Sequence, residues 1–402
     1  MNMKTVTTPI FTPIVTPIVH RLTLTLSGLG VTALLLSSCD ERARDRQSDT
    51  AASDTSADTV SDVGPDTTAG CAEDNLAACE YPSRGVELDE RSGISTTEPE
   101  TGRTLPLVAR VPRLPGPLPV VIWSHGGGFT QGGQLGSDAW GEAFARHGYV
   151  VIHVGHSPLG LDGARTLCTL ASVPEAECAP SEDDDANGLV AIGRSYDLKA
   201  VLDDLPRLSQ ISVNNDGPAL DLDRVAVVGW SGGARGPMTL MGAKVKPTAS
   251  APLFTNPHPL PKAAIFLSPA GPGFGGWYEA SNDNSFDALR GPTLSATGTH
   301  DVKPNKPQLT GEIRRRHFDL VPGDDERWLL YSNLPVGVGG HGTYELADLD
   351  SPDARLARFS DALVSTALAF LDASLSDDAA AAAWLASDNA RVLAGDADYQ
   401  HR

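Results

Sequence analysis

The feature of this sequence that most constrains its fold is a repeated alternation of short apolar runs with stretches of helical spacing. Runs such as 118–123 and 225–228 are uninterrupted, and each is followed by turn residues and a helical pattern. They lack the polar–apolar alternation of a half-exposed strand, which indicates strands that are buried on both faces. We therefore predict an α/β domain with a mainly parallel sheet that is covered by helices on both faces.

The predicted elements extend over most of the chain. Predicted strands cover 104–111, 118–123, 149–154, 224–229, 263–267, 292–299 and 327–332. Predicted helices cover 138–147, 195–208, 238–244 and 355–372, and an Ala-rich stretch over 377–393 predicts a peripheral helix. In sheets of this kind, ligands lie at the carboxyl ends of the strands. Residues that directly follow a predicted strand are therefore the first candidates for function.

The first 38 residues have the pattern of an export signal. Leu22–Leu36 is largely apolar, two basic residues precede it, and the first acidic residue is Asp40. The sequence Leu36-Ser37-Ser38-Cys39 resembles a bacterial lipobox, in which the cysteine becomes the lipidated first residue of the mature chain. We expect a lipoprotein signal peptide at 1–38 and a membrane anchor at Cys39. An ordinary signal peptide followed by a chance cysteine is the alternative.

A polar segment follows the predicted anchor. Residues 40 to about 70 are mostly Asp, Ser, Thr, Ala and Arg, with almost no large apolar side chain. Such a segment cannot bury enough apolar surface to offset its ordering entropy. We expect a flexible tether over 39–79 and one domain over 80–402.

The four remaining cysteines support an oxidising compartment. An even number of cysteines is typical of an exported protein with disulfides. Three connectivities are possible, and we favour pairing by proximity, Cys71 with Cys79 and Cys168 with Cys178. A zinc site is the less favoured reading, because no Cys-x-x-Cys or histidine cluster accompanies them. We therefore expect neither a metal nor a cofactor.

The charge balance argues against one class of partner. The chain has 31 Lys and Arg against 51 Asp and Glu, which gives a formal net charge of -20. A field of this sign repels phosphate backbones, so we do not expect nucleic-acid binding. The acidic run 182–185 could bind calcium, but a solvated surface segment is the preferred interpretation.

The strongest chemical motif is Gly229-Trp230-Ser231-Gly232-Gly233. It matches Gly-x-Ser-x-Gly and lies between a predicted strand and a predicted helix. Glycines allow the chain to turn sharply there, so that the serine hydroxyl is exposed as a nucleophile. The backbone N–H of Gly232 would then face a developing oxyanion.

A second glycine-rich loop, His125-Gly126-Gly127-Gly128, follows the predicted strand at 118–123. Its flexible backbone could supply the other oxyanion donor. We favour the N–H of Gly127, with Gly128 as the alternative. His125 is expected to be structural, and so are His153 and His156.

The order of a triad on this architecture is serine, acid, histidine. Asp301 lies in Gly298-Thr299-His300-Asp301, at the end of the predicted strand 292–299, and is the expected acid. Three histidines follow it. His317 lies in a helical pattern and His401 in a tail that we expect to fray, whereas His341 lies in a glycine-rich loop after the last predicted strand. We therefore predict Ser231, Asp301 and His341 as a catalytic triad.

Three aromatic side chains flank the proposed site in sequence. We expect Phe129, Trp230 and Trp277 to line an acyl pocket, with ordinary core packing as the alternative.

Residues from about 84 to 372 resemble an α/β-hydrolase of the predicted dienelactone hydrolase and platelet-activating-factor-acetylhydrolase-like type. The resemblance rests on the stretches 121–128, 146–151, 222–233, 298–301 and 340–342. It implies a carboxylic ester hydrolase with Ser231, Asp301 and His341 as triad and main-chain donors at Gly127 and Gly232. The nucleophile is Ser rather than Cys, which argues against dienelactone hydrolysis itself.

These observations together predict a serine esterase that is lipid-anchored outside the cytoplasm of a bacterium and acts on a small, lipid or polymeric ester. The alternative is a surface lipoprotein that uses the same fold as a binding scaffold without catalysis.

Overall fold

The computed structural model describes residues 71–179, 188–280, 283–303, 305–323, 325–347 and 351–402. The expected signal peptide (1–38), the expected anchor Cys39, the polar segment 40–70 and the acidic run 182–185 lie outside the described residues.

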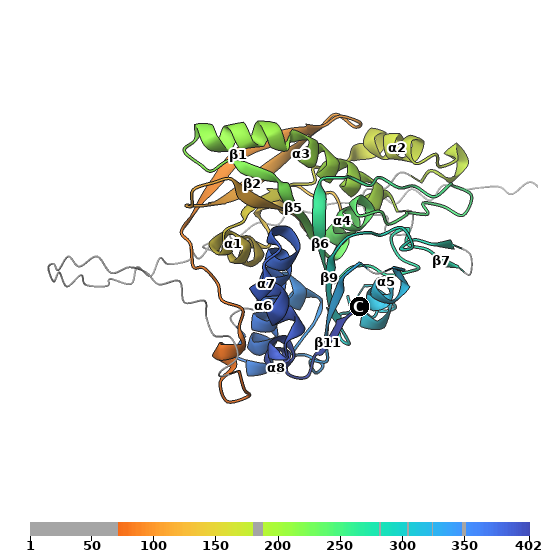
Figure 1. Cartoon of the computed structure of the whole chain (residues 1–402). Helices are drawn as coiled ribbons and strands as arrows, with labels where there is room; N and C mark the ends of the chain where they lie inside the picture. Colours follow the sequence, from red (N-terminus) through yellow and green to blue (C-terminus); the bar gives the residue numbers. More distant parts are fainter. Residues whose placement is uncertain (1–70, 180–187, 281–282, 304, 324, 348–350) are drawn as a thin grey trace, which may run out of the picture. The chain divides into compact units, whose positions relative to one another are not determined.

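One mixed sheet forms the centre of the part that the structure describes (Figure 1). Its nine strands, among the described residues, lie in the order β1-β2-β4-β3-β5-β6-β9-β10-β11. In chain order they are β1 (Leu88–Glu98), β2 (Arg103–Pro112), β3 (Leu118–Ser124), β4 (Val150–Val154), β5 (Leu220–Trp230), β6 (Pro261–Leu267), β9 (Thr293–Gly298), β10 (Arg327–Ser332) and β11 (Asp398–His401). Two short strands, β7 (Glu279–Ala280) and β8 (Asp283–Asn284), pair separately. The expected α/β class with a mostly parallel sheet is confirmed.

The six central strands, from β4 to β10 in the sheet order, are parallel to one another. The antiparallel pairs lie at the two edges, where β2 pairs with β1 and β4, and β11 pairs with β10. Because the central strands are parallel, their carboxyl ends share one edge of the sheet. The loops after β3, β5, β6, β9 and β10 therefore meet there.

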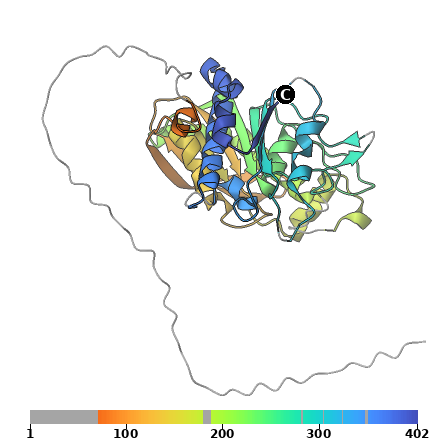
Figure 2. The same ribbon diagram turned by 90° about the horizontal axis from the view of Figure 1, so that it is seen from below.

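The helices cover both faces of this sheet (Figures 1 and 2). In β3, Val120 and Ile122 belong to one apolar core, whereas Val121 and Trp123 belong to the other. This division explains why the run in β3 contains no alternation of polarity: the central strands β3 and β4 bury both of their faces. The helices of the first core are α2 (Gly160–Leu170), α3 (Leu189–Asn214), α4 (Arg235–Leu240) and α5 (Gly311–Leu320), and those of the second are α1 (Asp138–His147), α6 (Ala354–Ser376), α7 (Ala379–Ala386) and α8 (Asn389–Ala394).

The segment Cys71–Cys79, expected to belong to the tether, packs against the C-terminal helices instead. Cys79 is fully buried, its carbonyl oxygen accepts a hydrogen bond of 3.0 Å from the Trp384 indole, and Glu73 pairs with Arg358. Residues 71–402 fall in one compact unit. The tether expected over 39–79 therefore does not extend through 71–79, because the Trp384 hydrogen bond and the Glu73–Arg358 ion pair attach this segment to the C-terminal helices.

Both disulfides have the expected pairing. Cys71 is bonded to Cys79, and Cys168 to Cys178. Each closes a short local loop, of 8 and 10 residues of separation. The second ties the end of α2 to the segment that follows it.

Two local predictions were wrong. The tail that contains His401 does not fray: it forms β11, and the His401 ring stacks on Trp328 with the ring centroids 3.7 Å apart. The helix expected at 238–244 begins earlier, at Arg235, because the turn after Ser231 is a single short 3-10 helix.

No helix among the described residues is long and apolar enough to cross a membrane.

Candidate active site

Ser231 lies at the sharp turn between β5 and α4. Its backbone has φ of 54°, in the left-handed region that a non-glycine residue rarely adopts. The flanking glycines are required by packing: a Cβ on Gly229 would lie 2.4 Å from the carbonyl oxygen of Gly233, and one on Gly233 would lie 2.1 Å from that of Ser124. Strained backbone of this kind is concentrated at functional sites.

The structure brings His341 and Asp301 to this serine. His341 begins a short 3-10 helix, His341–Glu345, after the loop that follows β10. Its Nε2 atom lies 2.8 Å from the Ser231 hydroxyl oxygen, and its Nδ1 atom lies 2.7 Å from Oδ1 of Asp301. The three side chains thus form one continuous chain of hydrogen bonds across 110 residues of sequence.

Asp301 is held by more than the histidine. It is 1% exposed. Thr297 donates its hydroxyl to Oδ2 at 2.8 Å, and the Arg314 Nε atom lies 3.2 Å from Oδ1. A buried carboxylate needs such partners to remain ionised and fixed in orientation.

Ser268 is a polar member of this site that the sequence analysis missed. It follows β6 directly, and its backbone also has a positive φ, of 48°. Its hydroxyl donates to Oδ1 of Asp301 at 2.8 Å and lies 2.8 Å from Nδ1 of His341. Its position in the sequence could have indicated it, because Ser268 directly follows the predicted strand 263–267 and the proposed triad residues also lie in loops that follow predicted strands. It was overlooked because it belongs to no known motif.

The surroundings of His341 favour its neutral form. Burial lowers the pKa of the imidazole, and the positive charges of Arg314 and Lys303 lower it further, while Asp301 opposes the change. A neutral imidazole with Nδ1–H directed to the carboxylate leaves Nε2 free to accept a proton from Ser231.

The two proposed oxyanion donors lie against each other. Gly127 has φ of 78°, and a Cβ on Gly232 would lie only 2.3 Å from the Gly127 carbonyl oxygen. The turn after β3 and the turn after β5 are therefore in direct backbone contact. Substitution at Gly232 would push the two turns apart.

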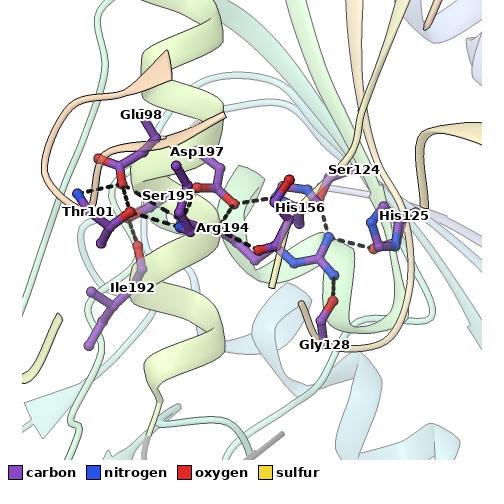
Figure 3. Close-up of polar contacts among 12 residues, drawn as sticks. Glu98, Thr101, Ser124, His125, Gly128, His156, Ile192, Arg194, Ser195 and Asp197 are labelled. Atoms are coloured by element: carbon purple, nitrogen blue, oxygen red, sulfur yellow. Dashed lines mark hydrogen bonds and ion pairs between the residues drawn. The ribbon is translucent and has the colours of Figure 1, made fainter. Parts of the chain in front are cut away.

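A buried arginine supports the loop that contains Gly127 (Figure 3). Arg194, on α3, is fully buried and donates to the carbonyl oxygens of His125, Gly127 and Gly128, the first two at 2.8 and 3.0 Å. Its Nη1 atom also lies 3.2 Å from the hydroxyl of Ser124. Four contacts from one rigid guanidinium fix the course of the loop.

Behind this loop lies a second array of serine, histidine and aspartate. The hydroxyl of Ser124 lies 2.9 Å from Nε2 of His156, whose Nδ1 lies 2.7 Å from Oδ2 of Asp197 (Figure 3). Asp197 is also paired with Arg103. All three members of the array are completely buried, so no substrate reaches the hydroxyl. The array is structural, as was expected for His156.

A cavity of about 360 Å³ opens beside Ser231. Its wall combines the two glycine turns with cationic side chains; the lining residues are Gly127, Gly128, Ser231, Gly232, Arg235, Ala270, Lys303, Asn305, Lys306, Leu309 and Arg314.

The aromatic residues that we expected to line the pocket lie elsewhere. Phe129 and Trp277 are 3% and 2% exposed and pack in the apolar core, because both side chains find complete burial there. Trp230 is half-buried, its ring lies 5.1 Å from the His341 ring, and its indole N–H donates to the His341 carbonyl oxygen at 3.2 Å. Trp230 thus supports the histidine loop, and the cavity has a cationic lining instead of an aromatic one.

The other two candidate histidines lie away from the serine. His317, on α5, is buried with its Nε2 atom 2.6 Å from the Ser295 hydroxyl, and His401 is in β11. Among the described residues, no group of three or more His, Cys, Asp or Glu side chains is arranged to bind a metal ion.

No protein-family model matches the chain, and no curated protein sequence matches it.

Proposed function

We propose that this protein is a serine carboxylic ester hydrolase with an α/β-hydrolase fold. The observation that carries the proposal is the unbroken hydrogen-bond chain from the Ser231 hydroxyl through His341 to Asp301. The position of the serine, on a strained turn at the carboxyl edge of a parallel sheet, supports the same reading.

In the acylation step, Ser231 Oγ attacks the ester carbonyl carbon while His341 Nε2 takes the hydroxyl proton. Asp301 stabilises the resulting imidazolium. The negative charge that develops on the carbonyl oxygen is stabilised by the backbone N–H groups of Gly127 and Gly232. When the tetrahedral intermediate collapses, the C–O bond to the alcohol breaks and His341 returns the proton to the departing oxygen.

In the deacylation step, a water molecule replaces the alcohol. His341 takes a proton from the water as its oxygen attacks the acyl carbon, and the bond to Ser231 Oγ then breaks. Serine recovers its proton from His341, and the carboxylic acid leaves. The net reaction consumes one water and needs no cofactor.

We further propose that the enzyme works in the cell envelope of a bacterium, anchored through lipid at Cys39. The two disulfides support an oxidising compartment, because such bonds are rarely kept in a reducing cytosol. Lipidation of Cys39 is testable by mass spectrometry of the membrane fraction, where Cys39→Ala should release the protein.

The direct test of the activity is Ser231→Ala assayed on short-chain methyl and p-nitrophenyl esters. We expect kcat to fall by roughly four to six orders of magnitude. Ser376→Ala, which alters an exposed serine at the end of α6, is the matched control and should retain turnover. A fluorophosphonate probe should label the parent protein and not Ser231→Ala. Unchanged turnover in Ser231→Ala would reject the proposal.

A further inference from the structure

The most exposed large apolar side chains among the described residues lie at one edge of the sheet. They are Val336, Leu135 and Leu161, which are 79%, 61% and 61% exposed. Val336 follows β10, Leu135 follows β3 and Leu161 follows β4. These strands run parallel, so the three side chains lie at the carboxyl edge that also holds Ser231. Single exposed apolar side chains are ordinary on any surface, whereas several at one edge indicate an interaction surface.

Val336 is held near the tip of a tight turn. The backbone N–H of Val338 donates to the Pro335 carbonyl oxygen at 3.0 Å. Leu334 is buried at the base of the turn, and a Cβ on Gly339 would lie 2.9 Å from its side chain. The turn is therefore anchored at its base while Val336 extends into solvent.

Leu135 lies on a second compact turn, the short 3-10 helix η2 (Gly133–Leu135). Its N–H donates to the Gly132 carbonyl oxygen at 2.9 Å, and the His125 ring leaves no room for a Cβ on Gly133. The turn thus rests on the first residue of the glycine loop 125–128. Preformed turns of this kind bind a surface without the entropic cost of ordering a flexible chain.

These two turns flank the short 3-10 helix that begins at His341. Val336 lies in the loop that leads into this helix. At the other end of the helix, Glu345 accepts a hydrogen bond of 2.7 Å from the Ser137 hydroxyl, which holds the segment after Leu135 in place. A surface that contacts both Val336 and Leu135 would therefore cover the rim of the site beside His341.

The described part of the chain begins toward the same edge. Glu73, close to the first described residue, pairs with Arg358 at 2.8 Å, near the start of α6. α6 follows the helix of His341 in the chain, so its start lies at the carboxyl edge. Residues 39–70 connect this point to the expected lipid anchor at Cys39, and a flexible chain of that length spans about 30 Å. An anchor at Cys39 would keep this edge close to a lipid surface.

The charge of the chain selects the kind of lipid. The formal net charge of -20 is repelled by anionic headgroups. Apolar side chains, in contrast, gain free energy by leaving water whatever the headgroup charge. The surface that suits this edge is therefore a zwitterionic phospholipid surface.

We propose that Val336, Leu135 and Leu161 form a lipid-docking surface, which seats the domain on a zwitterionic phospholipid membrane with the Ser231 edge toward the lipid. This inference goes beyond the proposed esterase function, because docking does not require the reaction. The three side chains enter the headgroup region and orient the domain, which a flexible anchor by itself cannot do.

The test measures the binding of purified Cys39→Ala protein, which cannot carry the lipid, to dioleoyl phosphatidylcholine vesicles by flotation. We expect the protein to float with the vesicles. Val336→Ser and Leu135→Ser in the same background should each lower the partition coefficient about tenfold, since each removes an apolar side chain from the contact. High salt should not release the protein, and phosphatidylglycerol in the vesicles should weaken binding.

Val213→Ser is the matched control. Val213 is 45% exposed near the end of α3. The chain after α3 leads to Ala219, whose carbonyl oxygen accepts a hydrogen bond from the N–H of Leu118, the first residue of β3, at 2.9 Å. Val213 therefore lies toward the opposite edge of the sheet, and its substitution should leave the partition coefficient within twofold.

Three outcomes would overturn the docking surface. The first is that the parent Cys39→Ala protein does not float, and the second is that Val336→Ser and Leu135→Ser bind as tightly as Val213→Ser. The third is a dimer in sedimentation velocity that Val336→Ser dissociates, without vesicle binding, since the surface would then serve a second copy of the chain.

Failure of the esterase proposal is distinguishable from failure of this one. Ser231→Ala in the Cys39→Ala background should float like its parent, because the serine hydroxyl takes no part in docking. Vesicle binding that is lost in Val336→Ser supports the docking surface even if the protein hydrolyses no ester.

Discussion

The guanidinium of Arg194 lies 3.0 Å from the carbonyl oxygen of Gly127, the residue proposed to supply an oxyanion N–H. The two residues are 67 positions apart, on α3 and on the turn after β3. A carbonyl oxygen and the N–H groups of a tight turn are coupled through rigid peptide planes. By fixing the carbonyl oxygens of this loop, Arg194 also fixes the direction in which its N–H groups point.

Removing the hydrogen bonds from Arg194 to the loop 125–128 should slow the reaction without removing any group that touches the substrate. We expect Arg194→Lys to lower kcat by about 10- to 100-fold with a smaller change in KM. A displacement of the oxyanion N–H groups by about 1 Å reduces the rate by this order. Lysine keeps the charge but cannot reach three carbonyl oxygens at once. The rate of labelling by the fluorophosphonate should fall in parallel. A kcat within twofold of the parent value in the folded variant would contradict a positioning role.

Ser268 offers a sharper test of the hydrogen bonds around Asp301. In Ser268→Ala the carboxylate loses one donor, so more of its negative charge acts on the imidazole and the pKa of His341 should rise. We expect kcat/KM to fall about tenfold, as for other hydrogen bonds to a catalytic charge. The acid limb of its pH profile should move to higher pH.

The control for that variant is Ser295→Ala. Ser295 is also buried and also lies against a histidine, His317, at 2.6 Å, but it does not touch the triad. It should alter stability and leave the pH profile in place. If both variants shift the profile equally, the effect of Ser268 is a general consequence of packing.

The parallel core of the fold was predictable because most of its strands contain an uninterrupted apolar run, although β9 alternates Thr and Ser with apolar residues. The runs at 118–123 and 327–332 correspond to β3 and β10 within one residue. The edge strands were not predictable in the same way. β1 contains several charged and polar residues, and β11 is four residues long in a polar tail, so neither shows an apolar pattern. β1 and β11 pair with β2 and β10 at the edges of the sheet, and this pairing depends on the folded sheet and not on a local sequence pattern.

The proposed triad residues could be selected from motifs and chain order, because each follows a predicted strand or its loop. The cationic cavity could not. Arg235 and Arg314 look like ordinary surface residues of amphipathic helices, but the structure buries both. Conversely, Phe129 and Trp277 were assigned to the pocket by sequence proximity, which does not reveal which way a side chain points. Burial of an arginine is a tertiary property that local pattern cannot supply.

The pH dependence of the proposed reaction follows from the surroundings of His341. Activity requires the neutral imidazole, so kcat/KM is lost as pH falls through the pKa of His341 in the free enzyme. Because burial and neighbouring cations lower this pKa from 6.5, we expect the midpoint of the acid limb below pH 6.5. Lys303→Met removes one of those cations, so its midpoint should lie at higher pH than that of the parent, whereas Lys262→Met, at an exposed position near the start of β6, should not move it. A midpoint above pH 6.5 in the parent protein would contradict this account.

Asp372, on α6, forms hydrogen bonds that join this helix to the N-terminal part of the described domain. Its carboxylate accepts hydrogen bonds from Tyr81 at 2.9 Å and Tyr149 at 2.5 Å, and lies 2.8 Å from Nε2 of His147. Burial alone would raise the pKa of Asp372, but His147 and the two tyrosines outweigh it and lower the pKa below 3.8. The stabilisation is therefore complete above about pH 3.8 and is lost as pH falls through the lowered pKa of the folded state.

We expect Asp372→Asn to lower the free energy of unfolding by about 3 kcal/mol at pH 7, since it removes the buried charge that Tyr81, Tyr149, His147 and Arg84 share. Urea unfolding followed by tryptophan fluorescence measures the change. Asp388→Asn, at an exposed position paired with Arg391, should change the value by less than about 1 kcal/mol. The difference between Asp372→Asn and the parent should shrink as pH falls below 3.8, because the parent carboxylate then becomes protonated as well. A difference that stays constant down to the acid transition would mean that shape, and not charge, makes this residue stabilising.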